Sequence, residues 1–213
     1  EDQYLLGDDT LVAPIDPFAN DGKEGAWNRA REVWLPPGSW LDAFTGEELR
    51  GGATVQRKDV AVDRLPLYHR KGGLVALAGE SDSSFVLEAW PSGNTSAPPS
   101  HRRVGAVGTA VLGHGPVPTV HVVPLRQSSW AIRFHLGEGN GLAFASADGV
   151  ALGGCASRGA PCMAVLQAVG ATVPFQGVGS RPARGVVVEV LLPASNAEFR
   201  VELVLAARGE LVI

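Results

Sequence analysis

The chain has 213 residues, and 22 acidic against 18 Lys and Arg residues give it a net charge of −4. Hydrophobic residues make up 45% and charged residues 19% of the sequence, a balance that argues against disorder and predicts a folded core. The sequence has no block of Lys and Arg and no apolar run near the roughly 20 residues of a membrane helix, which argues against nucleic-acid and membrane partners.

The first element expected along the chain is a short apolar strand at residues 10–15. Its sequence, Thr-Leu-Val-Ala-Pro-Ile, is typical of a strand that is buried on both faces, as in a parallel barrel. We identify no partner strand for it in the rest of the sequence. Since the chain opens at Glu1 and its only methionine is Met163, we interpret it as a piece of a longer polypeptide whose upstream domain supplies the partners.

Short strands with alternating character follow towards the C-terminus. Alternation of apolar and polar residues predicts half-buried strands, because successive side chains point to opposite faces of a sheet. The expected apolar faces are Phe85, Leu87 and Ala89; Trp130, Ile132 and Phe134; and Phe199, Val201, Leu203 and Leu205. Residues 186–192 are nearly all apolar, which predicts a strand covered on both sides.

Glycine and proline punctuate these strands. The 27 Gly and 15 Pro residues predict many turns, and many short strands between turns are typical of antiparallel β-sandwiches. The segment 92–100 (Ser-Gly-Asn-Thr-Ser-Ala-Pro-Pro-Ser) lacks apolar periodicity, so we expect a linker there. The predicted fold class is therefore all-β, with two antiparallel β-sandwich domains.

Three segments in the first 90 residues resemble glycoside hydrolase family 31, the α-glucosidase family. Residues 3–14 (QYLLGDDTLVAP) resemble the last barrel strand of that family. Residues 33–46 (VWLPPGSWLDAFTG) resemble its Leu-Pro-x-Gly-x-Trp-x-Asp-x-x-Thr-Gly segment. Residues 62–77 (VDRLPLYHRKGGLVAL) resemble the Asp-x-x-Pro-x-x-x-Arg-x-Gly strand that closes the module after the barrel.

The resemblance implies an order of domains. Residues 1–20 are expected to be a remnant of the last strand of a (β/α)8 barrel and the following loop, and residues 21–91 a proximal β-sandwich. The linker at 92–100 then leads to a distal β-sandwich at 101–213. That last region matches the family poorly, since its Tyr-Glu-Asp-Asp-Gly-like segment is absent, so the distal sandwich is assigned by position and strand pattern.

Residues 36–46 predict two tight turns. Pro36-Pro37-Gly38 sets up the first, because proline presets φ and glycine permits a positive φ. Asp42 with Thr45-Gly46 suits the second, and Trp40 and Phe44 bury large areas beside the turns. We interpret all of these residues as structural.

A catalytic pair is not expected in this chain. Retaining glycosidases need two carboxyl groups about 5 Å apart, and the resemblance implies that both are aspartates on upstream barrel strands. Asp8 and Asp9 precede the apolar strand, whereas barrel active sites lie beyond the C-terminal strand ends, so we interpret them as turn residues. Asp16 follows the strand, on the active-site side, and no catalytic role is expected for it.

The sequence gives little support for a zinc site, a phosphate-binding loop or a catalytic cysteine. The histidines are scattered rather than grouped at zinc spacing: His69, His101, His114, His121 and His135. Residues 137–141 (Gly-Glu-Gly-Asn-Gly) lack the closing lysine of a phosphate loop and predict a hairpin loop. Cys155 has no evident base, and Cys155 and Cys162 either pair across a short hairpin or remain free thiols. We therefore predict no catalytic, substrate-binding, cofactor-binding or metal-binding residue.

The tryptophans and one sequon leave questions open. Trp27, Trp90 and Trp130 invite a sugar-stacking hypothesis, but the alternation around Trp130 favours a core position for it. Asn94-Thr95-Ser96 is an N-glycosylation sequon, which matters only in a secreted protein. We favour a secretory or extracellular location.

Three functional hypotheses follow. In the first, the chain is the non-catalytic part of a retaining α-glycosidase. It packs against the catalytic barrel of the same polypeptide, holds active-site loops and meets the carbohydrate substrate only through that barrel. The chain alone is then inactive. The second hypothesis is a free-standing carbohydrate-binding β-sandwich, and the third is an inactive structural fragment.

Overall fold

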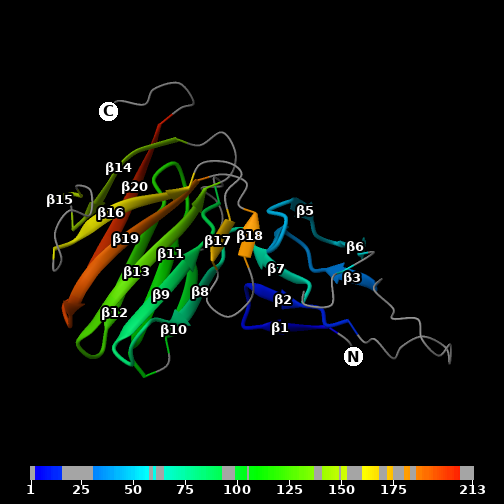
Figure 1. Ribbon diagram of the computed structural model, residues 1–213, viewed down its shortest axis with the longest axis horizontal. Helices are drawn as coiled ribbons and strands as arrows, with labels where there is room; N and C mark the ends of the chain where they lie inside the picture. The colour runs from blue at the N-terminus through cyan, green and yellow to red at the C-terminus, as the bar shows by residue number, and fades with distance from the viewer. Residues whose placement is uncertain are drawn as a thin grey trace. The chain divides into compact units, whose positions relative to one another are not determined.

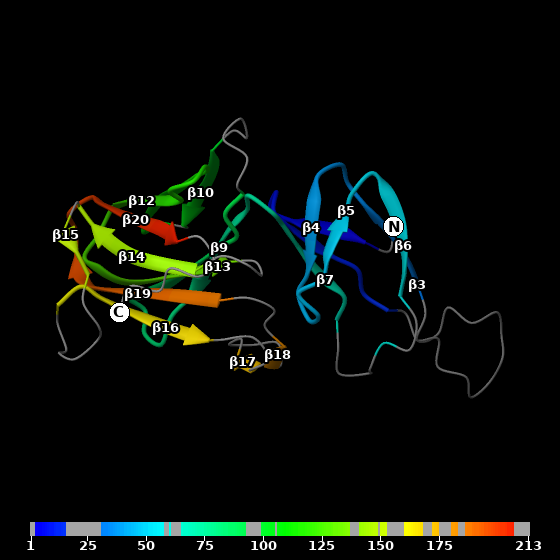
Figure 2. The same cartoon turned by 90° about the horizontal axis from the view of Figure 1, so that it is seen from above.

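The computed structural model describes twenty β-strands in this chain (Figures 1 and 2). The described residues are 3–15, 31–57, 60, 65–92, 99–104, 106–136, 141–148, 150–152, 160–167, 172–174, 180–182 and 186–206. Every regular element in these ranges is a strand, which confirms the predicted all-β fold class. Within the same ranges, no helix has the length and apolar character to cross a membrane.

Contacts divide the chain into two compact units. The first unit comprises Glu1–Lys71 with Thr172–Pro182, and the second comprises Gly72–Ala171 with Ala183–Ile213. The division therefore lies between Lys71 and Gly72, earlier in the chain than the linker expected at 92–100. Of that expected linker, residues 93–98 lie outside the described residues.

The first unit contains a five-stranded antiparallel sheet and a two-stranded one that faces it. The larger sheet has the order β1 (Tyr4–Leu6), β2 (Thr10–Val12), β7 (Leu67–Arg70), β4 (Ser39–Asp42) and β5 (Glu48–Arg50). The smaller sheet pairs β3 (Arg31–Leu35) with β6 (Ala53–Arg57). Between them lies a buried cluster of Leu11, Ala13, Val33, Leu35, Trp40 and Tyr68. A separate pair, β17 (Thr172–Pro174) and β18 (Ser180–Pro182), is also assigned to this unit.

The strand predicted at residues 10–15 has partners within the chain, so the expectation that it has none is wrong. β2 pairs with β1 on one side and with β7 on the other, and both pairings are antiparallel rather than barrel-like. All three residues of β2 are buried, as the apolar run predicts. The missed partner, β7, lies more than 50 residues downstream, and nothing in a short apolar run specifies such a distant pairing.

The second unit is a sandwich of two larger sheets. One has the order β10 (Ser100–Val104), β11 (Gly108–Gly113), β12 (Thr119–Pro124), β20 (Phe199–Ala206), β14 (Gly141–Ala147) and β15 (Val150–Ala151). The other has the order β16 (Cys162–Gln167), β19 (Val186–Ser195), β13 (Ser128–Leu136), β9 (Ser84–Ala89) and β8 (Leu74–Ala78). All of these pairings are antiparallel except that of β9 with β13, which is parallel.

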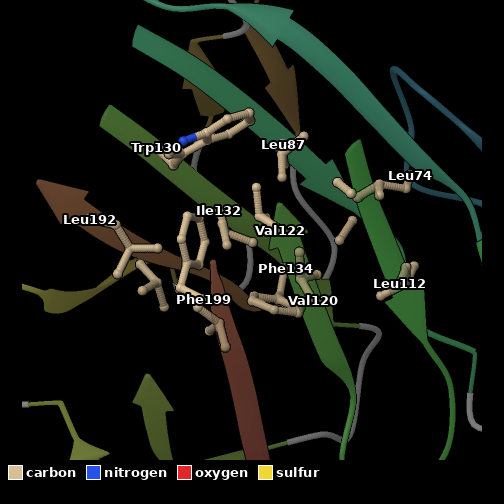
Figure 3. Packing of buried hydrophobic residues seen from close by; sticks show 14 of the residues in the cluster. Leu74, Leu87, Leu112, Val120, Val122, Trp130, Ile132, Phe134, Leu192 and Phe199 are labelled. Carbon is tan, nitrogen blue, oxygen red and sulfur yellow. The ribbon is translucent and has the colours of Figure 1, made fainter. Parts of the chain in front are cut away.

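The core of the second unit lies between its two sheets and includes Trp130, Ile132 and Phe134 of β13 (Figure 3). The ring of Trp130 lies 5.2 Å from that of Phe85 and 6.2 Å from that of Phe199, measured between centroids. Buried and half-buried residues alternate along the whole of β13, which confirms the predicted period and the core position of Trp130. Of the other predicted apolar faces, Leu87 and Ala89 are buried and Phe85 is half-buried, and Phe199, Val201 and Leu203 are buried.

Strands β8 and β9 were expected in the first module, but they complete a sheet of the second. β9 runs alongside β13 from Ser84 to Ala89, and β8 pairs with β9 in turn. The pairing is non-local, since β13 begins about 40 residues after β9 ends, so strand alternation alone does not reveal it. The division between the two units is therefore set by pairing between distant strands, and not by the turn-forming residues of the segment 92–100.

Candidate functional site

Asp42, at the end of β4, organises the turn that leads into β5. Its Oδ1 accepts hydrogen bonds from the backbone N–H groups of Phe44 and Thr45, at 2.8 and 2.9 Å. Gly46 has a φ of 70°, and its N–H donates to the backbone carbonyl of Asp42. The turn predicted from Asp42 and Thr45-Gly46 is confirmed, and the carboxylate serves as a local backbone acceptor.

Arg70, at the end of β7, ties together three segments that are distant in sequence. Its guanidinium carbon lies 4.5 Å from the centroid of the buried Trp40 ring, a cation–π contact. Its Nη1 donates to the backbone carbonyl of Pro37 at 3.1 Å, and its Nε donates to that of Asp8 at 3.3 Å. The same Nε lies 4.0 Å from the Asp9 carboxylate. The arginine of the family-like segment is therefore a structural clamp.

Asp8 and Asp9 occupy the turn between β1 and β2, as predicted. The Asp9 side chain is buried, and its backbone carbonyl accepts a hydrogen bond of 2.8 Å from the N–H of Arg70. Asp8 is exposed and contributes its backbone carbonyl to the Arg70 clamp. Asp16, the remaining aspartate considered for this region, lies outside the described residues.

The second unit carries a buried ionic network on the face of the five-stranded sheet opposite the core. Its members come from three adjacent strands: Glu88 from β9, Arg133 and His135 from β13, and Glu189 from β19. The strand register places Arg133 between Glu88 on one side and Glu189 on the other. Alternation along β13 turns Arg133 and His135 away from the Trp130 core.

The geometry of this network engages both oxygens of Glu88. Arg133 Nη1 lies 3.1 Å from Glu88 Oε1, and Arg133 Nε lies 2.8 Å from Glu189 Oε1. His135 Nε2 contacts Glu88 Oε2. The ring of Trp90 stacks on that of His135, with centroids 4.8 Å apart and an interplanar angle of 12°.

The electrostatics keep Arg133 charged. Burial lowers the pKa of Arg133, but the hydrogen bond that Arg133 donates to Glu189 and the charges of Glu88 and Glu189 outweigh burial, so the net shift is upward. The side chain of Glu88 is only 2% exposed. A buried carboxylate whose two oxygens are both engaged by cationic or hydrogen-bonding partners is suited to cross-linking strands, not to attacking a substrate.

Sequence reasoning missed this network, although part of its pattern was visible. Alternation already placed Arg133 and His135 on the face away from the core. Glu88 and Glu189 each interrupt an apolar run, which signals a paired charge when the strand is buried. Only the register of β9 and β19 against β13 reveals that the four side chains meet.

The remaining residues considered from the sequence are dispersed. His69 is buried, with its Nδ1 3.2 Å from the hydroxyl of Thr10, whereas His121 pairs with Glu198 at 2.5 Å on an exposed face. Among the described residues, no three His, Cys, Asp or Glu side chains gather as a metal site would require.

Trp90 is buried, and Cys162 is disulfide-bonded. Trp27, Asn94, Glu138 and Cys155 lie outside the described residues.

Comparison with known proteins finds a family match for the first part of the chain. Residues 1–75 match the glycosyl hydrolase family 31 C-terminal domain. The α-xylosidase of Saccharolobus solfataricus is 32% identical over 83 residues, which is 38% of this chain and 10% of that protein. The 1,3-α-isomaltosidase of Kribbella flavida is 35% identical over 69 residues, 32% of this chain and 8% of that protein. The chain thus spans about a tenth of these curated relatives.

Solved structures share the fold over nearly the whole chain. The family 31 dextranase of Flavobacterium johnsoniae has a TM-score of 0.67 at 14% identity, covering 95% of this chain and 26% of its own. The cycloalternan-forming enzyme of Listeria monocytogenes has a TM-score of 0.67 at 17% identity, covering 97% of this chain and 19% of its own. Residues 1–75 of this chain therefore match the glycosyl hydrolase family 31 C-terminal domain, and solved proteins such as these share the fold along almost all of the chain.

Proposed function

We propose that this chain is the non-catalytic C-terminal β-sandwich portion of a retaining α-glycosidase, and that it stabilises the catalytic barrel and its active-site loops. The observation that carries the proposal is the family match over residues 1–75. The relatives include an α-xylosidase, a 1,3-α-isomaltosidase and an α-glucosidase, which supports hydrolysis of α-glycosidic bonds by the intact enzyme.

The buried carboxylates already have hydrogen-bond or ionic partners within the chain, which supports the non-catalytic part of the proposal. Retaining hydrolysis requires two carboxyl groups that approach the sugar, one as nucleophile and one as acid/base. Asp42 holds a backbone turn, Asp9 lies beside Arg70, and Glu88 is sealed by Arg133 and His135. In our proposal the nucleophile and the acid/base come from the barrel.

An exposed apolar surface on the first unit supports a partner domain. The edge strand β1 exposes Tyr4, Leu5 and Leu6 by 54, 45 and 63%, and Trp34 of β3 is 49% exposed. The amide of Gln3 links the two strands, since it hydrogen-bonds to both the N–H and the carbonyl of Trp34. Large apolar side chains gathered on a surface are typical of packing against another protein surface.

The test compares the 213-residue chain with the complete polypeptide that its gene encodes. Both are assayed on aryl α-glucosides and α-xylosides, and the anomer first released is followed by proton NMR. We expect no turnover by the 213-residue chain and release of the α-anomer by the complete polypeptide. Turnover by the chain alone, or inactivity of the complete polypeptide on all α-linked substrates, contradicts the proposal.

A carbohydrate-binding module is a second candidate, favoured by the exposed aromatic rings of Tyr4 and Trp34. Aromatic faces pack against sugar rings, but Trp90 and Trp130 are buried and unavailable for such stacking. Titration calorimetry of the chain with malto- and isomalto-oligosaccharides separates the candidates. Binding that Trp34→Ala removes favours this second function, and the absence of binding heat rules it out.

A further inference from the structure

Strands β8 and β9 form a hairpin, residues 72–92, that lies on one edge of β13. β9 pairs with β13 in parallel, and within the sheet β8 pairs only with β9. We propose that this edge of β13 is a strand-binding site. Its ligand is the hairpin, which it also binds when the hairpin is supplied as a separate peptide. The inference concerns the second unit alone and is independent of the proposed glycosidase function.

Backbone pairing holds the hairpin along the whole of β9. The register runs from Ser84 opposite Ser129 to Ala89 opposite Phe134. Just before β9, the carbonyl of Ser83 accepts a hydrogen bond of 2.9 Å from the N–H of Ser129. When a segment adds to a sheet edge, main-chain hydrogen bonds supply affinity and the side chains at alternate positions supply specificity. The two faces of the hairpin therefore define what the site recognises.

One face of the hairpin closes the core of the second unit. Leu74 and Leu87 are fully buried in the same cluster as Trp130, and Figure 3 shows both leucines among the labelled core residues. The ring of Phe85 lies 5.2 Å from that of Trp130, measured between centroids. If the hairpin leaves, these apolar groups face water, which is unfavourable. The core is therefore expected to be closed only when the site is occupied.

Glu88 carries the specificity on the opposite face of the hairpin. It lies opposite Arg133 in the register, with its Oε1 3.1 Å from Arg133 Nη1 and its Oε2 in contact with His135 Nε2. A shift of the hairpin by two residues keeps the apolar side chains towards the core but moves Glu88 away from Arg133. A buried carboxylate without its partner is strongly destabilising. The site therefore selects an extended segment in which apolar residues alternate around one glutamate.

The β8–β9 turn is held by hydrogen bonds of its own. Ser84 Oγ donates to the carbonyl of Ser81 at 3.0 Å and accepts from the N–H of Ser81 at 2.7 Å. Arg126, in the turn before β13, donates from Nη2 to the carbonyl of Asp82 at 2.7 Å. Bonds within the turn reduce the entropy that a free hairpin loses on binding. Residues 72–92, rather than β9 alone, are therefore the appropriate peptide ligand.

A full-length Leu87→Asp variant tests whether the hairpin binds as a separate ligand. An aspartate is costly to bury among apolar side chains, so the variant is expected to release its own hairpin. Titration calorimetry with a synthetic peptide of residues 72–92 should then show saturable 1:1 binding. The unaltered chain, whose site is occupied, should not bind the peptide. No binding to the variant, or equal binding to the unaltered chain, overturns the proposal.

Two altered peptides test the role of Glu88 in recognition. Glu88→Gln removes the buried charge and is expected to weaken binding to the Leu87→Asp variant roughly 10- to 100-fold. Glu80→Gln is a matched control, because it removes the same charge at an exposed position of the β8–β9 turn. This control peptide should bind as tightly as the unaltered one. Equal affinities of all three peptides refute Glu88 as the residue that sets specificity.

Hydrogen exchange in the unaltered chain gives a test that does not depend on the folding of the Leu87→Asp variant. If the core is closed only with the hairpin in place, amides of β9 and β13 exchange through the same opening. Their protection factors are then expected to agree within about threefold. Protection of β9 that is lower than that of β13 on the order of a hundredfold shows that the core stays closed without the hairpin, and contradicts the proposal.

Discussion

Buried carboxylates in this chain act as hydrogen-bond acceptors that hold strands and turns in place. Glu88 joins β9 to β13 through Arg133 and His135, and Asp42 closes the β4–β5 turn through two backbone N–H groups. Removing one residue of such a group leaves its partners buried without a hydrogen-bond or ionic partner. The resulting loss in the free energy of unfolding is larger than what an exposed pair contributes. The contribution of each acidic residue to the free energy of unfolding therefore depends on how deeply its side chain is buried.

The variant Glu88→Gln tests this dependence in the second unit. Glutamine keeps the shape of the side chain but removes its charge, so the free energy of unfolding is expected to fall by about 2 kcal/mol. Glu198 is a matched control, since it also pairs with a histidine but its side chain is 61% exposed. Glu198→Gln should change stability by less than about 0.5 kcal/mol. Equal effects in urea denaturation contradict the structural role of Glu88.

Asp42 offers a parallel test in the first unit. Asp42→Ala leaves the N–H groups of Phe44 and Thr45 without their side-chain acceptor, and we expect a loss of roughly 1–3 kcal/mol. Asp42→Asn retains an acceptor oxygen and should lose clearly less. If the two variants are equally destabilised in urea, the hydrogen-bonded turn is not what makes Asp42 important.

For the strands, local sequence patterns predicted which residues are buried better than they predicted which strands pair. Alternation located β13 and the described part of β20 with their buried faces, and turn-forming residues located the β4–β5 turn. The run at residues 10–15 predicted burial correctly, but the sequence did not reveal that β2 pairs with β1 and β7. The ionic network was missed for the same reason, because register between distant strands is set by the assembled core.

The edge strand β1 is expected to promote association of the 213-residue chain. All three of its residues are exposed, and an unpaired apolar edge promotes association. Leu6→Lys is expected to reduce the concentration-dependent association of the 213-residue chain in sedimentation velocity, because a charged edge resists pairing. Thr109→Lys, which adds the same charge at an exposed position of β11, an interior strand of the second unit, should leave association unchanged. The interpretation fails if both variants associate alike.

For the whole molecule, the role that we propose for these sheets is to support a catalytic barrel rather than to take part in catalysis. Family-like segments at residues 33–46 and 62–77 contribute to one buried cluster, in which Trp40 and Tyr68 are fully enclosed. Motifs that mark the family in this chain are therefore packing and turn motifs. That is why the family was recognisable from sequence while its substrate was not.

Trp40→Phe in the complete polypeptide distinguishes a supporting role of this chain from a catalytic one. The change removes the 2.7 Å hydrogen bond from Trp40 Nε1 to the Pro36 carbonyl and shrinks a fully buried ring. A loss of about 1.4 kcal/mol corresponds to a tenfold change in rate, so we predict thermal inactivation on the order of tenfold faster, with kcat/KM unchanged at low temperature. A fall in kcat/KM of similar size with an unchanged inactivation rate would show that this chain takes part in the chemistry, and would contradict the proposed supporting role.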